Sequence, residues 1–372
     1  MKILLVGIST RALAQSAAAA GYEVISLDFF GDCDQPAGAE VYSLVRDLGQ
    51  PPELFSLARA ATGFIPRVDR VVVEAGLENE PALLEFCPSK KRWGNSAEAV
   101  TRVRNLDLVR DALVGTGIHL PEVIHPAEAL PASGHFLVKD TAHSGGTGVR
   151  QWDGHTPPRG REVLQRFIHG ELASACFIAD GRQARLLGLT RQYAGEPELG
   201  APAYAWCGNV APWGGLELEH LVLDAITTLT ESFGLVGLNG IDFILKNGVP
   251  FLLEVNPRPP ASFELFERLL GVNAFQLHVE ACQKQLPSNL PPVPTDLAWG
   301  KGILYARENL LVGETRSWAA QDVSDVPHSG EQIPAGAPVC TIFAKGKDAA
   351  GCWAAVLARA NDWPPAARVP PE

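Results

Sequence analysis

The sequence predicts an α/β protein that begins with a parallel sheet and continues into a mixed region of helices and strands. Residues 1–8 form a largely apolar run, a helix capped by Ser9 or Thr10 is expected over residues 11–20, and residues 23–30 form a second apolar run. Parallel strands need a crossover, so this strand–helix–strand order implies a parallel sheet. With a further buried strand at 70–74, residues 1–94 are predicted to be a small α/β domain.

The next two hundred residues predict alternating helices and strands. A helix is expected from Asn95 or Ser96 to about Leu113, followed by three strand-like runs within 136–180 and by helices over 221–233 and within 269–286. Residues 204–212 carry aromatic residues two apart and then a Gly-Asn turn. They fit a strand with a substrate-facing loop and, equally, plain core and turn.

The C-terminal part is predicted to be rich in strands. A Pro-rich stretch at 287–294 marks a boundary, and residues 300–345 then alternate in strand fashion between Gly and Pro turns. The Pro- and Ala-rich residues 364–372 are expected to fray.

Composition excludes several classes of protein. The net charge of −11 argues against non-specific nucleic-acid binding, which needs a basic face. Seven scattered cysteines argue against a disulfide framework and favour a reducing compartment. The N-terminus lacks the features of a signal peptide, and no apolar run approaches the length of a membrane span, so a cytoplasmic protein without a membrane partner is expected.

A β-hairpin near residue 247 carries two acids. Apolar runs at 240–245 and 251–255 flank a turn that contains Asn-Gly, the strongest short-range hairpin signal. Side chains alternate along a strand, so pairing can bring Asp242, Glu254 and Asn256 onto one surface. Two carboxylates and an amide oxygen suit Mg²⁺. The alternative is an ordinary hairpin whose acids face solvent.

A glycine-rich loop follows a strand that ends near Lys139. Residues 141–149 contain three glycines and three hydroxyl residues, whose backbone N–H groups can wrap phosphate oxygens. Lys139 would place a positive charge beside the phosphates. No Gly-Lys-Ser/Thr follows the glycines, so this is not a Walker loop. A plain glycine-rich turn is the alternative.

In this order, these features resemble the ATP-grasp superfamily. The resemblance rests on the strand lysine and loop, the hinge-like segment 164–171 and the Glu-Val-Asn-Pro-Arg-Pro run at 254–259. It implies an α+β fold in which two subdomains clasp ATP, with Mg²⁺ as the metal. The implied boundaries are 1–94 for the N-terminal domain, 95–160 for the subdomain with the glycine loop, 161–290 for the subdomain with the metal site, and 291–372 for a C-terminal β-rich segment and tail.

The resemblance also implies roles for individual residues. The residues implied to contact the nucleotide are Lys139, Ser144, Gly145, Gly146, Thr147, Gly148, Gln165, Arg166, Phe167, Ile168 and Glu171. Asp242, Glu254 and Asn256 would hold one or two Mg²⁺ ions. Lys139 and Arg258 would be the catalytic cations, with Arg258 bracing the transferred phosphoryl group.

The N-terminal domain of such enzymes helps to bind the acid or the acceptor. A dinucleotide site is not expected there, because G-x-G-x-x-G is missing after the first strand. Ligands of open α/β sheets lie beyond the carboxyl ends of the strands. The residues predicted to form the substrate wall are Ser9, Thr10, Arg11, Asp28, Glu78 and Asn79, with Asn209 from the second subdomain.

Two positions depart from the family pattern. Gln165 stands where many members carry a glutamate, and Leu106 stands where a second phosphate lysine is common. Arg104 and Arg110 are the nearby cations, so one phosphate contact has no assigned residue.

The chain is most similar to a predicted ATP-dependent carboligase branch found in methanogenic archaea and methylotrophic bacteria. The resemblance implies a ligase that converts a small-molecule carboxylate into an acyl-phosphate for attack by an amine, in one-carbon cofactor biosynthesis of the tetrahydromethanopterin or methanofuran type. We consider a homodimer as the assembly that this chain forms. Biotin-carboxylase-like activation of bicarbonate and nucleotide binding without catalysis are the alternatives.

Overall fold

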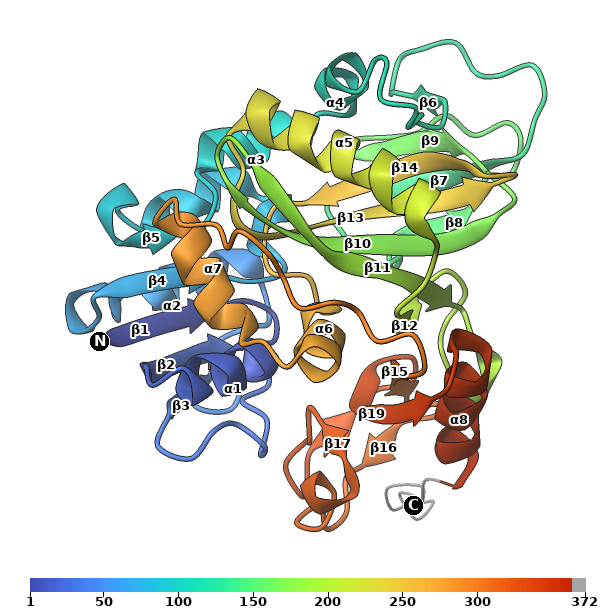
Figure 1. The fold of residues 1–372 in the computed structure, drawn as a ribbon. Helices are drawn as coiled ribbons and strands as arrows, with labels where there is room; N and C mark the ends of the chain where they lie inside the picture. Colours follow the sequence, from blue (N-terminus) through green and yellow to red (C-terminus); the bar gives the residue numbers. More distant parts are fainter. Residues whose placement is uncertain (363–372) are drawn as a thin grey trace.

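The computed structural model describes residues 1–362 and contains three principal sheets (Figure 1). A five-stranded sheet belongs to the N-terminal part, a four-stranded sheet to the middle, and an eight-stranded sheet joins the middle to the C-terminal part. The expected α/β and α+β classes are confirmed. The tail at 364–372, for which fraying was expected, lies outside the described residues.

The N-terminal sheet is parallel throughout, in the order β3-β2-β1-β4-β5. Its strands are β1 (Lys2–Val6), β2 (Glu23–Asp28), β3 (Glu40–Ser43), β4 (Arg70–Val73) and β5 (Arg92–Trp93), with helices α1 (Arg11–Ala19) and α2 (Leu54–Thr62). The predicted strand–helix–strand unit is therefore confirmed. The short strands β3 and β5 and the helix α2 were not predicted.

The four-stranded sheet is antiparallel, in the order β6-β9-β7-β8. Its strands are β6 (Val123–Ile124), β7 (Phe136–Asp140), β8 (Val149–Gln151) and β9 (Glu162–Arg166), preceded by α3 (Ala97–Val103) and α4 (Leu106–Ala112). The single helix expected from 95 to 113 is wrong. The Asn105 side chain accepts hydrogen bonds from the N–H groups of Asp107 and Leu108, so it caps a new helix and interrupts the first.

The eight-stranded sheet runs in the order β14-β13-β10-β11-β12-β15-β19-β17. Its strands are β10 (Glu171–Asp180), β11 (Ala184–Ala194), β12 (Trp206–Ala211), β13 (Val236–Lys246), β14 (Val249–Asn256), β15 (Ala298–Tyr305), β17 (Val323–Ser324) and β19 (Pro338–Gly346). A small ladder pairs β16 (Leu310–Leu311) with β18 (Gln332–Ile333). The predicted Gly-Asn turn is wrong, because Asn209 lies inside β12 and pairs with Gln192 and Lys301.

Four helices accompany this sheet. They are α5 (Leu216–Phe233), which runs across the sheet in Figure 1, α6 (Phe263–Leu270), α7 (Ala274–Cys282) and α8 (Ala349–Asp362). The helix predicted within 269–286 is confirmed as α7, which Asn273 caps. Helix α6 was not predicted, and it ends at Gly271, which takes a left-handed φ of 65°. Helix α8 was not predicted. No helix of residues 1–362 is long and apolar enough to cross a membrane.

The predicted hairpin forms as expected. Asn247 and Gly248 both have positive φ, 51° and 79°, as the tight turn between two twisted strands requires. The strand register places Asp242 opposite Glu254 and Gly240 opposite Asn256. The hairpin therefore presents its two acids and the amide from one end of the large sheet.

One hydrophobic core joins the N-terminal domain to the large sheet. Leu5 of β1, Phe275 of α7 and Ile178 of β10 are fully buried in the same cluster. The N-terminal domain and the large sheet therefore share a packed interior, whereas the four-stranded sheet has a small cluster of its own around Phe136 and Leu164.

Candidate active site

A cavity of about 390 Å³ lies between the four-stranded and eight-stranded sheets. The predicted site residues that line it are Lys139, Ser144, Gly145, Gly146, Gly148, Gln165, Phe167, Ile168, Asn209, Asp242, Glu254, Asn256 and Arg258. Three other predicted nucleotide residues, Thr147, Arg166 and Glu171, are not part of its lining. Segments separated by about one hundred residues in sequence thus meet in one cavity.

The hairpin places its polar side chains in contact. Asn256 Nδ2 donates to Asp242 Oδ2 at 2.8 Å, and Gln192 Nε2 donates to Asp242 Oδ1 at 2.7 Å. Asn256 Oδ1 accepts from Arg258 Nη2 at 3.1 Å. An ordered set of oxygen ligands therefore faces the cavity.

The two carboxylates have opposite pKa shifts. Burial and the adjacent charge of Glu254 raise the pKa of Asp242 to about 7. Burial would also raise the pKa of Glu254, but the charges of Lys139 and Arg104 outweigh it and hold that pKa at about 2. Two acids held together at partial burial repel each other, and a divalent cation between them would relieve the repulsion.

The donor set fits Mg²⁺. Two carboxylates and an amide oxygen are hard oxygen ligands that leave coordination positions for water and phosphate. Nowhere in residues 1–362 do three or more His, Cys, Asp or Glu side chains gather in a way that could hold a metal, so the described residues offer no zinc site built from such a set. Asp242, Glu254 and Asn256 are the residues that would hold the ion.

Two cations approach Glu254 from different elements. Lys139 Nζ of β7 lies 3.5 Å from Glu254 Oε2, and Arg104 Nη1 at the end of α3 lies 3.7 Å from the same oxygen. Arg110 instead faces outward and pairs with Asp107 at 2.6 Å. Of the two cations near Leu106, Arg104 is therefore the one that approaches the hairpin acids.

The glycine-rich loop is docked against the large sheet. The N–H of Trp206 in β12 donates to the Gly145 carbonyl at 2.9 Å. A Cβ added at Gly146 would lie 1.9 Å from the Tyr204 carbonyl oxygen, so glycine is required for this close approach. Ser144, Gly145, Gly146 and Gly148 of the loop line the cavity.

The hinge strand contributes one unsatisfied donor. Gln165 of β9 is 7% exposed, lines the cavity, and its buried Nε2 has no hydrogen-bond partner. Buried polar groups normally have a partner, so this amide is available to a ligand. Arg166 pairs with Glu122 instead, and Glu171 lies 3.5 Å from Arg191.

The residues predicted to form the substrate wall separate into two groups. Asn209, Glu78 and Asn79 adjoin the site: Asn209 accepts from Trp206 Nε1 at 2.7 Å, Glu78 binds Arg258, and Asn79 binds Ser144. The other four, Ser9, Thr10, Arg11 and Asp28, line neither this cavity nor the one adjoining it.

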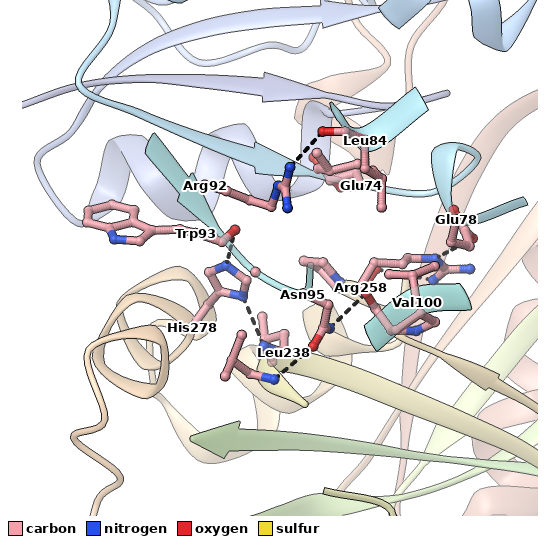
Figure 2. Close-up of a pocket in the computed structure, with 15 residues that line it drawn as sticks. Glu74, Glu78, Leu84, Arg92, Trp93, Asn95, Val100, Leu238, Arg258 and His278 are labelled. Atoms are coloured by element: carbon pink, nitrogen blue, oxygen red, sulfur yellow. Dashed lines mark hydrogen bonds and ion pairs between the residues drawn. The ribbon is translucent and has the colours of Figure 1, made fainter. Parts of the chain in front are cut away.

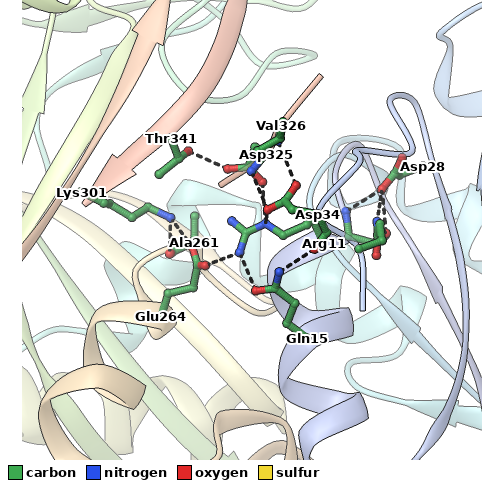
Figure 3. A network of polar contacts seen from close by, with 12 residues as sticks. Arg11, Gln15, Asp28, Asp34, Ala261, Glu264, Lys301, Asp325, Val326 and Thr341 are labelled. Atoms are coloured by element: carbon green, nitrogen blue, oxygen red, sulfur yellow. Dashed lines mark hydrogen bonds and ion pairs between the residues drawn. The ribbon is translucent and has the colours of Figure 1, made fainter. Parts of the chain in front are cut away.

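Thr10, Arg11 and Asp28 are instead held by the protein itself. Figure 3 shows Arg11 and Asp28 with their surroundings. Asp28 accepts hydrogen bonds from the N–H and hydroxyl of Thr10 at 2.9 and 2.7 Å. Arg11 is 1% exposed and donates to Glu264 at 2.6 Å and to Asp325 at 2.9 Å. Its guanidinium thus links α1 to α6 and to the C-terminal segment.

A second cavity of about 460 Å³ adjoins the first. Both are lined by Lys139, Leu253 and Glu254, so the Lys139–Glu254 pair lies at their border. Arg104 and Arg161 line only the second. Because Arg104 also reaches Glu254, its charge acts at the border of both cavities.

Some residues that line the cavity were not assigned to the site from the sequence, although a substrate-facing loop was one interpretation of residues 204–212. Gln192, Tyr204 and Trp206 line the cavity from β11, β12 and the segment before β12. The aromatic pair two apart was the only local signal for the last two. Gln192 had none, because its contact with Asp242 spans fifty residues.

Part of the chain matches a known domain family. Residues 107–262 match the ATP-grasp domain family. An uncharacterized protein of Methanocaldococcus jannaschii is 23% identical, over 93% of this chain and 88% of its own.

Two solved structures are similar over nearly the whole length. An L-amino acid ligase from Bacillus licheniformis superimposes with a TM-score of 0.68 at 16% identity, covering 97% of each chain. An N5-carboxyaminoimidazole synthetase from Staphylococcus aureus, solved with ADP, gives 0.71 at 14% identity, covering 96% of each. Residues 107–262 thus match the ATP-grasp domain family, and the fold of the whole chain is similar to that of these two solved structures.

Proposed function

We propose that this protein is an ATP-dependent ligase that joins a small-molecule carboxylic acid to an amine and releases ADP and phosphate. One observation carries the proposal: the cation Lys139, the glycine-rich loop, the free amide of Gln165 and the hairpin acids line a single cavity. Lys139 would contact phosphate and the loop would cover it. The Gln165 amide would donate to the edge of a base, and the hairpin acids would bind a cation.

The protein groups would act mainly by positioning and charge. Lys139 and Arg104 would bind the phosphates, and Gln165 Nε2 would donate to an acceptor of adenine. Mg²⁺ held by Asp242, Glu254 and Asn256 would neutralise phosphate charge when bound. These roles agree with phosphoryl transfer, in which the protein positions the reacting groups and supplies little covalent chemistry.

The proposed reaction has two steps. A carboxylate oxygen of the acid attacks the γ-phosphorus of ATP, the bond to the β–γ bridging oxygen breaks, and ADP leaves. The amine then attacks the acyl carbon, the carbon–oxygen bond to phosphate breaks, and the amine loses a proton to solvent or buffer. Arg258, beside Asn256, would hold oxygens of the transferred group with its planar guanidinium.

The proposed pathway is one-carbon cofactor biosynthesis. Its support is the resemblance to the carboligase branch, together with the similarity to the Methanocaldococcus jannaschii protein over most of both chains. In this proposal ATP lies between the subdomains 95–160 and 161–290.

ADP release tests the proposal. The wild-type protein is incubated with Mg²⁺-ATP alone, with bicarbonate, and with a small-molecule extract that contains acids and amines, and new products are followed by mass spectrometry. We expect ADP release that depends on the extract, a product whose mass is that of acid plus amine minus water, and loss of both in Lys139→Ala. Release stimulated by bicarbonate would favour the carboxylase alternative, and nucleotide binding without release would favour the non-catalytic one.

A further inference from the structure

The turn after β4 reaches from the N-terminal domain into the site. The chain leaves β4 at Val73 and turns at Gly76 into a short 3₁₀ helix, Leu77–Asn79. Gly76 has φ 114°, and an added Cβ would lie 2.8 Å from Ile8 Cγ1 and 2.9 Å from a Leu54 methyl carbon. Only glycine fits there, so the turn is fixed against the N-terminal domain.

Glu78 of this turn binds Arg258. Its side chain is 2% exposed, and its Oε1 accepts from Arg258 Nε at 2.9 Å, as Figure 2 shows. The Gly76 N–H donates to the other oxygen, Oε2, at 2.5 Å. Both carboxylate oxygens are therefore engaged by the protein. The other end of the Arg258 guanidinium reaches Asn256 Oδ1, so Glu78 fixes its orientation beside the proposed metal ligands.

Asn79 binds two other parts of the site. Its Nδ2 donates to Ser144 Oγ of the glycine-rich loop at 2.8 Å. Its Oδ1 accepts from Arg104 Nη2 at 2.8 Å. Asn79 is buried, at 5% exposure, and its single amide connects the glycine-rich loop to Arg104, the cation proposed to bind phosphate. Loop closure and the position of Arg104 thus depend on the same residue.

We propose that Glu78 and Asn79 are positioning residues through which the N-terminal domain organises the ATP site. Glu78 orients Arg258, and Asn79 holds the glycine-rich loop closed and Arg104 in place. This role differs from the direct substrate contact expected from the sequence, because the polar atoms of both side chains are engaged by the protein. The inference rests on the proposed function, since it assigns the two residues to the use of ATP.

A double-mutant cycle tests Glu78. ADP release is measured under the extract conditions described above for Glu78→Gln, Arg258→Lys and the double variant, with Mg²⁺-ADP affinity measured by calorimetry. We expect Glu78→Gln to slow ADP release by about tenfold or more, the scale of one hydrogen bond to a charged group, with affinity changed by less than about threefold. If Glu78 acts through Arg258, the double variant is no slower than Arg258→Lys alone. Additive losses would overturn this part of the inference.

Proteolysis of the glycine-rich loop tests Asn79. We expect Mg²⁺-ADP to protect residues 144–148 in the wild type and to protect them much less in Asn79→Ala. Ser144→Ala removes the partner atom without altering the buried turn, and it should reproduce the loss. Wild-type protection in both variants would overturn the assignment.

Glu80→Gln is the matched control. Glu80 follows the same turn, but its side chain is 46% exposed and pairs with Arg161. It should behave as wild type in every assay, and a loss equal to that of Glu78→Gln would show a general effect of charge removal. A wild-type protein that binds no Mg²⁺-ADP would refute the proposed function itself. Normal nucleotide use in the wild type with unaffected variants would refute only the positioning roles.

Discussion

Gly146→Ala tests whether docking of the glycine-rich loop controls nucleotide binding. Gly146 has φ 78°, and a methyl group there would lie 1.9 Å from the Tyr204 carbonyl oxygen, about 1.5 Å short of an ordinary 3.4 Å contact. The loop would have to move away from the cavity by roughly that distance, weakening its hydrogen bond to Trp206.

Gly145→Ala is the matched variant, because Gly145 lies in the same loop with φ 64° and nothing within 4 Å of an added Cβ. Both variants share the left-handed backbone cost, about 1–2 kcal/mol for alanine. Only Gly146→Ala adds the clash, so we expect it to bind Mg²⁺-ADP at least about tenfold more weakly than Gly145→Ala, or about 1.4 kcal/mol. Calorimetric titration gives both affinities, and thermal unfolding checks that the fold is retained. Equal affinities would refute the argument that the docked loop is the binding-competent one.

Three further variants address the charges of the site. Arg104→Ala should weaken Mg²⁺-ATP binding by about tenfold in calorimetry, whereas the outward-facing Arg110→Ala should not, and equal effects would mean that Arg104 acts only through net charge. Glu254→Gln should abolish Mg²⁺-dependent ADP release at an unchanged melting temperature, and near-normal release would remove the hairpin from the mechanism. Burial raises the pKa of Glu74, whose Oε1 has no hydrogen-bond partner. The folded protein therefore binds the Glu74 proton more tightly than the unfolded chain does, so the stability of the protein falls as the pH rises above the ordinary carboxyl pKa. Glu74→Gln should reduce that fall in urea unfolding between about pH 5 and about pH 8, and an unchanged profile would show that another group is responsible.

The sequence predicts features encoded over a few residues. Asn247-Gly248 specifies the hairpin turn, and the alternation of side chains then brings Asp242 and Glu254 to one face without knowledge of the rest of the chain. Competition between a capping side chain and a continuing helix is harder to predict from the local sequence. The helical pattern across 95–113 hid the cap at Asn105, because a capping side chain and a continuing helix are both compatible with that composition.

Contacts between distant segments could not be predicted in this way. Arg104 reaches Glu254 across one hundred and fifty residues, and nothing in its local sequence marks it as different from Arg110. Arg11 carries the signature of a ligand-binding residue at a strand end, yet its partners are Glu264 and Asp325. Whether a polar side chain meets a ligand or another part of the protein depends on tertiary packing.

The buried Arg11 network limits how this chain can be divided. Glu264 is shared by Arg11 and by Lys301, which lies 2.8 Å away, so one acid neutralises cations from the first and last parts of the sequence. Removing residues beyond about 290 would leave Glu264 and Arg11 with fewer partners in a dry interior, and breaking a buried pair costs about 3–5 kcal/mol. The strand order also argues against removing this part of the chain, since β15, which begins at Ala298, pairs directly with β12 in the large sheet. A shortened chain, or a chimera with a relative, would therefore have to keep Arg11, Glu264, Lys301 and Asp325 together.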